Sequence, residues 1–327
     1  MAAVSASGPI GTEGVQAEGG SQVTVGTSAR EGGIPDAVKG ILWMLLTAAL
    51  FMVMDVIAKW LSESYPTNQI TWGRFFFHAL FLGLYLNHRL LATLRSNRLG
   101  LQLTRSCLML ATNFLFFTGL AYLGLAEITA IMYVAPLVTT LLAVPLLGEA
   151  VGWRRIASVI VGFIGALIII RPGSESLSWA VLFPLAAAFS HAAYQITTRM
   201  LSRSEGSLTT LAYTALVGAV ISTLALPLGW EPPDLIGWLG LMGMGLFGCL
   251  GHFTFIRAFT VADAALVSPF AYTSLLWASL FGYFLFSEVP DIWTIVGAAV
   301  VAGSGLYIVH RERQRLRHPV SPWRPSR

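Results

Sequence analysis

The chain between residues 38 and 310 alternates between long apolar runs and short polar breaks, and this alternation restricts the fold more than any other feature. Each run approaches the roughly 20 apolar residues that a helix needs to cross a bilayer. The runs show no residue-by-residue alternation and are longer than the strands of a membrane barrel. We therefore predict an all-α integral membrane protein with ten transmembrane helices, at about residues 40–60, 68–87, 104–122, 127–147, 154–171, 178–199, 207–228, 236–257, 263–286 and 291–310.

The composition supports a bilayer as the solvent of this chain. Hydrophobic residues make up 55% of the 327 residues and charged residues only 11%, less than half of the roughly 25% in an ordinary soluble domain. These values exclude a disordered chain, a collagen and a disulfide scaffold, and they argue against a soluble enzyme. The two cysteines, Cys107 and Cys249, lie inside apolar runs without metal-ligand spacing, so we expect no metal site, and we expect no cofactor.

The distribution of basic residues predicts the orientation. Of the 20 Lys and Arg residues, 17 fall on one side of the predicted spans, the other three being Lys59, Arg74 and Arg171. Basic residues that flank apolar runs on one side mark the cytoplasmic side, so the net charge of +4 does not indicate nucleic-acid binding. We predict a multi-pass protein of the inner (plasma) membrane with cytoplasmic N- and C-termini.

The two ends of the chain differ from its middle. Residues 1–37 are rich in Gly, Ser, Ala, Thr and Glu and lack the apolar segment of a secretory signal, which predicts a disordered cytoplasmic tail. Residues 311–327 contain six arginines and are predicted to be a basic cytoplasmic tail close to anionic lipid.

The two halves of the apolar region resemble each other. Residues 126–149 match residues 262–288 at an offset of 139, which pairs Tyr133 with Tyr272 and Glu149 with Glu288. Because each half has five spans, an odd number, the second half must enter the membrane from the opposite side. We therefore predict two inverted five-helix repeats, residues 38–173 and 174–310, as in many secondary transporters.

Several motifs indicate a family. The run from residue 126 to 173 contains "APL" in mid-span, "LLGE" at the end of that span, and a Gly-rich span that closes with "RPG"; residues 287–309 repeat this ending. The run resembles the EamA domain of the drug/metabolite transporter superfamily. Residues 54–82 look most like members related to bacterial riboflavin and S-adenosylmethionine uptake carriers. The resemblance implies a ten-helix transporter fold and a recurrent role for Arg74 in the second span.

Ionisable side chains inside apolar runs cost at least about 2.5 kcal/mol at mid-depth, so each needs a reason. Asp55 lies in the first span, and Arg74 and His78 share one face of the second. Two interpretations remain open for Asp55 and Arg74. They contact substrate or exchange partners during opening, or they form a structural ion pair that locks two helices together.

Polar stripes supply further candidates for substrate binding. Hydroxyl-bearing residues on otherwise apolar helices face other helices or a cavity, and the repeat places Tyr133 and Tyr272 near its two-fold axis. Interhelical hydrogen bonding alone is the alternative. A polar face in the sixth span and scattered side chains elsewhere complete the set: His191, Tyr194, Gln195, Asn113, His252 and Trp277.

Motifs for ATP-driven transport, zinc hydrolysis and serine hydrolysis are absent from the sequence. We therefore expect no enzyme but a secondary transporter that moves a small metabolite by alternating access. A riboflavin-like or other planar or amphipathic cargo fits the inferred lining. An exporter of amino acids or toxic amphiphiles is the alternative, and a membrane scaffold or a lipid enzyme ranks lower. Monomer and homodimer both remain open.

Overall fold

The fold is helical throughout the part of the chain that the structure describes. A computed structural model describes residues 36–147, 153–171, 178–202, 204–262 and 264–317, and no strand occurs among them. The main helices are α1 (Asp36–Leu61), α2 (Thr67–Leu86), α4 (Leu99–Leu120), α5 (Leu125–Met132), α6 (Ala135–Leu147), α7 (Trp153–Ile170), α8 (Leu182–Leu201), α9 (Ser207–Ala225), α10 (Leu235–Val261), α12 (Thr273–Phe286) and α13 (Ile292–Arg317). Short helices connect or extend them: η1 (Asn87–Arg89), α3 (Leu90–Thr93), η2 (Trp179–Val181), η3 (Leu226–Leu228), α11 (Ala264–Val267) and η4 (Ser268–Tyr272).

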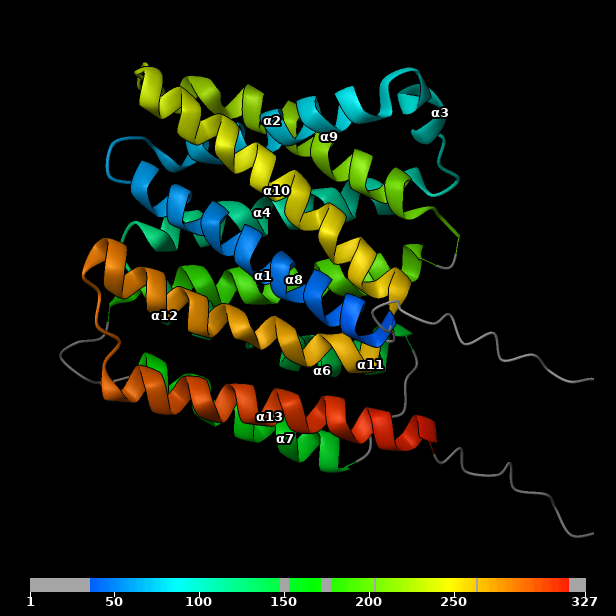
Figure 1. Cartoon of the computed structure of the whole chain (residues 1–327), viewed down its shortest axis with the longest axis vertical. Coiled ribbons are helices and arrows are strands. Elements are labelled where there is room, and N and C mark those ends of the chain that lie inside the picture. Colours follow the sequence, from blue (N-terminus) through cyan, green and yellow to red (C-terminus); the bar gives the residue numbers. More distant parts are fainter. Residues whose placement is uncertain (1–35, 148–152, 172–177, 203, 263, 318–327) are drawn as a thin grey trace, which may run out of the picture. The chain divides into compact units, whose positions relative to one another are not determined.

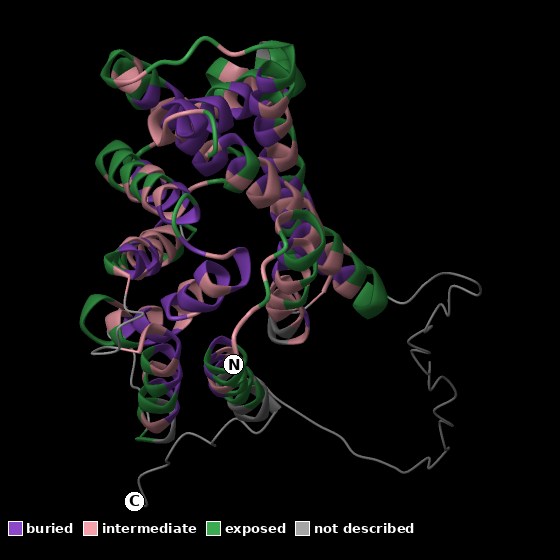
Figure 2. Ribbon diagram, turned by 90° about the vertical axis from the view of Figure 1, so that its left-hand side faces the viewer, coloured by how far each residue is buried: buried purple, intermediate pink, exposed green. Residues whose placement is uncertain are grey.

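Six of these segments are long and apolar enough to cross a membrane, and three shorter apolar helices accompany them. Large apolar side chains also cover the outside, as with Leu224 at 75% exposure and Phe284 at 70%. In Figure 2 the buried residues lie where helices face one another and the exposed residues point outward. A surface of this kind needs lipid as its solvent, so the chain is a multi-pass membrane protein.

Two predicted spans are interrupted, which differs from the continuous helices expected at 127–147 and 263–286. The first breaks between α5 and α6, and the second passes through α11 and η4 before α12 begins. Pro136 is the second residue of α6, and a proline clashes with the carbonyl four residues earlier, here that of Met132, where α5 ends. Pro269 likewise stands near the start of η4. Both broken helices belong to the related segments of the two halves.

Helix packing joins the two halves rather than building each half separately. Helix α1 packs on α10, and α8 packs on α4, which is the same pairing with the halves exchanged. The contact of α10 with α2 corresponds in the same way to that of α4 with α9, while the contacts of α2 with α9 and of α7 with α13 map onto themselves when the halves are exchanged. A contact pattern that survives exchange of the halves is the mark of a two-fold pseudosymmetric repeat.

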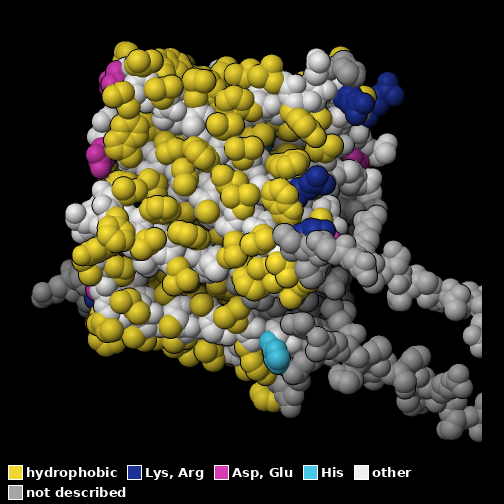
Figure 3. Space-filling model, viewed as in Figure 1, with side chains coloured by type: hydrophobic (Ala, Val, Ile, Leu, Met, Phe, Trp, Pro, Cys, Tyr) yellow, Lys and Arg dark blue, Asp and Glu magenta, His cyan; other side chains and the backbone are white. Residues whose placement is uncertain are grey.

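The long helices run side by side, and α1 begins at the same end at which α13 finishes (Figure 1). Basic side chains gather there, on the right in Figure 3, while the middle of that face is hydrophobic. We call this the basic end; the opposite end, where α1 finishes, is the acidic end. Residues of the basic end include Lys39, Arg95, Arg98, Arg199 and Arg257; those of the acidic end include Glu63, Glu231, Asp234, Glu288 and Asp291.

The glycines of α10 allow close helix packing. A Cβ on Gly245 would lie 2.3 Å from the Cβ of Phe77 and 2.7 Å from the backbone nitrogen of His78, a distance that side-chain atoms do not tolerate. Helix α10 itself is continuous from Leu235 to Val261. Close approach of α10 to α2 therefore accounts for Gly245, and it brings His78 against the second half of the chain.

Candidate functional site

Arg74 lies at the centre of a polar cluster between the helices, although its position in α2 is apolar on either side. Its side chain is only 2% exposed. The Nη1 atom donates to the Oδ1 atom of Asn113 on α4 at 2.7 Å and to the weak acceptor Sδ of Met54 on α1 at 3.4 Å. The Asn113 amide is itself held by the Met109 carbonyl at 2.8 Å. Because the Nε atom of Arg74 has no partner among the described residues, this guanidinium is only partly satisfied.

Asp55 is a carboxyl group of α1 next to Met54, which Arg74 contacts. It lies on the inward face of α1, three residues from Met52 and from Ala58, which are 2% and 1% exposed. Asp55 and Arg74 interact electrostatically, yet among the described residues Asp55 forms no hydrogen bond and no ion pair. The structural ion pair considered for these two residues is therefore not formed in this structure.

Three histidines surround Arg74 and complete the polar cluster. The rings of His78 on α2 and His252 on α10 lie 5.4 Å apart between centroids, and His191 on α8 stacks on Tyr194 at the same separation. All three histidines interact electrostatically with Arg74. His252 contacts the Gly248 carbonyl through Nδ1 at 2.8 Å, whereas His78 Nε2 and His191 Nδ1 are buried without a partner among the described residues.

Seven of the predicted residues thus meet at one place, from five helices of both halves. We call this group the central cluster: Asp55, Arg74, His78, Asn113, His191, Tyr194 and His252. It combines two opposite charges that do not touch with three buried side-chain nitrogens that lack partners. Unpaired buried polar atoms are rare in proteins and call for a ligand or water. The arrangement can bind a polar molecule, and no metal-binding group of three or more His, Cys, Asp or Glu residues occurs among the described residues.

Arg105 extends the central cluster toward the basic end and was missed by the sequence reasoning. We counted it with the basic residues that flank the spans, but its side chain is only 5% exposed. Its Nη2 atom donates to the Tyr194 hydroxyl at 2.7 Å, and its guanidinium lies over the Tyr194 ring at 4.4 Å. Nε donates to Thr198 at 2.7 Å, and Nη1 to the Thr210 carbonyl and the Thr214 hydroxyl. Because α4 begins five residues before the predicted span, Arg105 lies inside the helix bundle rather than on its surface.

The repeat-related tyrosines meet where the two broken helices are interrupted. The rings of Tyr133 and Tyr272 stack with centroids 4.5 Å apart and planes inclined by 22°. The Tyr133 hydroxyl donates to the Ala271 carbonyl at 2.6 Å and lies 2.5 Å from the Ser274 hydroxyl. The residues therefore contact each other across the two halves, as their pairing in the repeat predicts.

Two predicted site residues lie apart from the central cluster. The Oε1 atom of Gln195 accepts a hydrogen bond from Thr139 at 3.3 Å, and Trp277 stacks on Phe281 at 6.0 Å next to the main hydrophobic core. Thr129 and Thr140, the other described hydroxyls of the fourth-span stripe, donate to carbonyls of their own helix four residues earlier. Of these hydrogen bonds, the one between Thr139 and Gln195 joins two helices, α6 and α8, and the other two lie within one helix.

The acidic end contains charges that are paired. Lys59 at the end of α1 forms an ion pair with Glu288 at 2.6 Å and donates to the Leu123 carbonyl at 2.8 Å. The other carboxylate oxygen of Glu288 accepts the backbone N–H of Leu125, at the start of α5, at 2.8 Å. Ser287 ends α12 in a left-handed conformation, with φ 55°, and so turns the chain toward this contact. Glu288 therefore joins the end of α12 to the ends of α1 and α5, whereas its repeat partner Glu149 lies outside the described residues.

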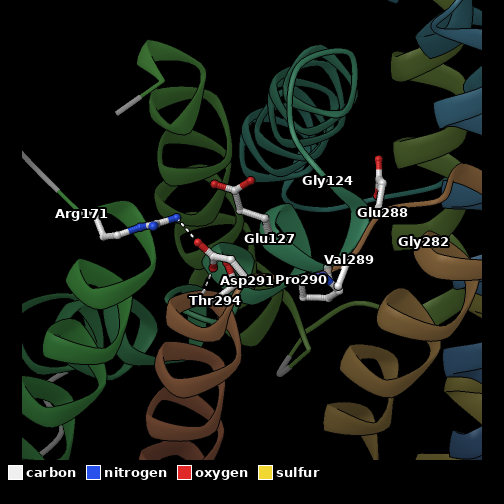
Figure 4. Close-up of a pocket in the computed structure, with 10 residues that line it drawn as sticks. Gly124, Glu127, Arg171, Gly282, Glu288, Val289, Pro290, Asp291 and Thr294 are labelled. Atoms are coloured by element: carbon white, nitrogen blue, oxygen red, sulfur yellow. Dashed lines mark hydrogen bonds and ion pairs between the residues drawn. The ribbon is translucent and has the colours of Figure 1, made fainter. Parts of the chain in front are cut away.

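A second ion pair at the acidic end joins Arg171, after α7, to Asp291, before α13. Burial alone would raise the pKa of Asp291, but the hydrogen bonds of Thr294 and the Arg171 guanidinium outweigh burial and hold this pKa below its ordinary value. The two pairs, Lys59–Glu288 and Arg171–Asp291, are called the end pairs below. Three of their residues, Glu288, Arg171 and Asp291, line a pocket of about 240 Å³, in which Glu127 lies beside Arg171 and Asp291 (Figure 4).

Comparisons with known proteins agree with this architecture. The model of the EamA-like transporter family matches residues 38–171 and 178–309. The chain is 30% identical over 285 residues to an S-adenosylmethionine uptake transporter of Rickettsia bellii (strain RML369-C), covering 86% of this chain and 98% of that protein. It is also 30% identical over 286 residues to a riboflavin transporter of Rhizobium johnstonii, covering 86% and 95%.

One solved crystal structure shares the fold, with a TM-score of 0.59, 19% identity, and coverage of 86% of this chain and 99% of that one. The family match covers both halves, and each half carries one of the two interrupted helices. The chain therefore belongs to the EamA-like transporter family, with one family domain in each of its two repeats.

Proposed function

We propose that this protein is a secondary transporter that moves a small metabolite across the inner membrane by alternating access. The observation that carries the proposal is the packing of the two halves around the central cluster. The helix contacts of one half are repeated when the two halves are exchanged. Helices from both halves supply that cluster, so a movement of one half against the other changes access to it. Sites between repeats, next to interrupted helices, are typical of secondary transporters.

The end pairs support alternation between two open states. Lys59 belongs to the first repeat and Glu288 to the second, and the same holds for Arg171 and Asp291. Ion pairs that join the two halves close the acidic end while they last, and opening at this end must separate them. The sorting of basic side chains to the other end supports ten spans with both termini in the cytoplasm, so the acidic end is the outer end.

Riboflavin-like molecules, S-adenosylmethionine and other planar or amphipathic metabolites are the cargo that we propose, because relatives of this chain are named for two of these compounds. Export of an amino acid or a toxic amphiphile is the alternative direction and cargo. A scaffold would have no use for two halves in opposite orientation around a buried polar cluster, and a lipid enzyme would need a catalytic group at the membrane surface.

Flux in reconstituted vesicles tests the proposal. Purified full-length protein in liposomes should move labelled S-adenosylmethionine or riboflavin down a gradient, or in exchange for unlabelled compound inside, without ATP. Flux that depends strictly on ATP would contradict the carrier mechanism. Catalytic turnover of the compound without net movement would favour an enzyme instead.

A further inference from the structure

The central cluster contains a guanidinium, that of Arg74, and a carboxyl group, that of Asp55, neither of which contacts a charged partner among the described residues. Arg74 touches only the neutral groups of Asn113 and Met54, and its Nε atom is unpartnered. Asp55 makes no hydrogen bond or ion pair among the described residues, although it lies within electrostatic reach of Arg74. Charges inside a membrane protein are normally paired or hydrogen-bonded. This pair is held close without contact, which indicates a ligand between or beside the two groups.

The surroundings keep the two charges apart. Asn113 binds the Nη1 face of Arg74 at 2.7 Å and is itself fixed by the Met109 carbonyl, so the guanidinium is oriented before any ligand arrives. Asp55 is on a different helix, α1, whose neighbouring turn is packed by Met52 and Ala58. A preoriented guanidinium presents two parallel donors, the geometry that a carboxylate matches best.

The sign of the charges selects the class of ligand. A simple anion would pair with Arg74 and leave Asp55 repelled, while a simple cation would pair with Asp55 and be repelled by Arg74. An uncharged ring system would leave both charges buried and unpaired. A group that carries a carboxylate and an ammonium on the same carbon atom can satisfy both side chains at once.

We propose that the central cluster recognises the α-amino-acid head of its ligand, with the ligand carboxylate on Arg74 and the ligand ammonium on Asp55. This inference rests on the proposed transport function and narrows its cargo to zwitterionic metabolites. S-adenosylmethionine carries such a head; riboflavin and adenosine do not. His78, His191 and Tyr194 are then neutral donors and acceptors for the remainder of the molecule, and Asn113 is a positioning residue for Arg74.

Ligand pairs that differ by one charged group test this assignment. Thermal stabilisation of the purified full-length protein is measured with S-adenosylmethionine, decarboxylated S-adenosylmethionine, adenosine and riboflavin, and vesicle uptake of the first and last compounds is measured in parallel. We expect S-adenosylmethionine to bind about 30-fold or more tightly than its decarboxylated analogue, since one partner of a buried charge pair is then missing.

The variants Arg74→Gln and Arg74→Lys assign the effect to this side chain. Arg74→Gln should bind S-adenosylmethionine and its decarboxylated analogue within about 3-fold of each other, and Arg74→Lys should restore part of the preference. A purely structural role of Arg74 would weaken all ligands alike and leave the preference unchanged. If the Gln variant does not fold, the ligand series on the unchanged protein and on Arg74→Lys decides.

Two results overturn the inference in different ways. Uptake of riboflavin, with no preference for any compound that bears an amino-acid head, contradicts this assignment and leaves the carrier function standing. Equal binding of S-adenosylmethionine and its decarboxylated analogue contradicts the assignment of the ligand carboxylate to Arg74. Tight and selective binding without any flux contradicts the carrier function and supports the recognition of the zwitterion.

Discussion

The central cluster and the end pairs use the same side-chain chemistry in opposite ways. At the acidic end, Lys59 and Glu288 are in contact at 2.6 Å, and Arg171 contacts Asp291. In the central cluster, Asp55 and Arg74 interact at a distance and do not pair. The end pairs are partly exposed and join the two halves, whereas in the central pair Arg74 is only 2% exposed and no ion pair with Asp55 is formed. We propose that the completed pairs serve structure and gating and that the incomplete pair serves ligand binding.

The largest expected effect is on vesicle uptake, which should depend strongly on the central cluster and weakly on the end pairs. Arg74→Gln and Asp55→Asn should each reduce uptake into vesicles by about 30-fold or more, because each removes one partner of a buried charge contact with the ligand. Arg171→Gln is the matched comparison, as it removes an arginine charge from an end pair; we expect uptake within about 3-fold of the native protein, because a partly exposed ion pair contributes only about 0–1 kcal/mol to closure of the acidic end. Uptake is normalised to the monodisperse protein recovered. A loss of uptake of the same size in Arg171→Gln would contradict the proposed difference between the central cluster and the end pairs.

An intermediate effect is expected on thermal stability when the ion pair between Lys59 and Glu288 is removed. The Glu288 side chain also accepts the Leu125 N–H, which Glu288→Gln preserves through its amide oxygen. Lys59→Met should therefore lower the melting temperature in detergent more than Glu288→Gln. The double variant should show a coupling of about 0.5–3 kcal/mol, as for residues in direct contact. Additive effects would show that the ion pair is not made in the protein.

The smallest effect concerns the exposed pair of Arg171 and Asp291. Its contribution should be about 0–1 kcal/mol, as for ion pairs near solvent. Because the folded state lowers the pKa of Asp291, this contribution is complete above the ordinary value of 3.8 and is lost as the pH falls through the lower, folded value. The melting temperatures of native protein and Asp291→Asn should thus differ at neutral pH and converge in acid. A difference that grows in acid would contradict the sign of this pKa shift.

The fold could be predicted from the sequence because its signals are local. Apolar length, the placement of basic residues and an odd number of spans per repeat together give the helical class and the relation of the halves. The helix interruptions were not predicted, because residues 127–147 were read as one continuous span although Pro136 lies within them. A proline within an apolar run was the signal for this break.

The candidate residues could be singled out from the sequence by type, but their contacts could not, and their role in a site stays a prediction. The cost of charge in lipid singles out Asp55, Arg74 and the histidines, yet whether two charges touch depends on the packing of helices distant in sequence. Arg105 escaped notice because a basic residue near a helix end looks like a flanking residue. Lys59 and Glu288 escaped because no sequence pattern reports a contact between the ends of two repeats.

Equilibrium binding tests the central claim most directly. The affinity of the purified protein for S-adenosylmethionine is measured by calorimetry in detergent for the native chain, Arg74→Gln and Arg171→Gln. The account predicts a Kd about 30-fold or more higher for Arg74→Gln and a Kd within about 3-fold of native for Arg171→Gln. The same Kd for all three proteins, or the same loss in both variants, would contradict a ligand site at the central cluster.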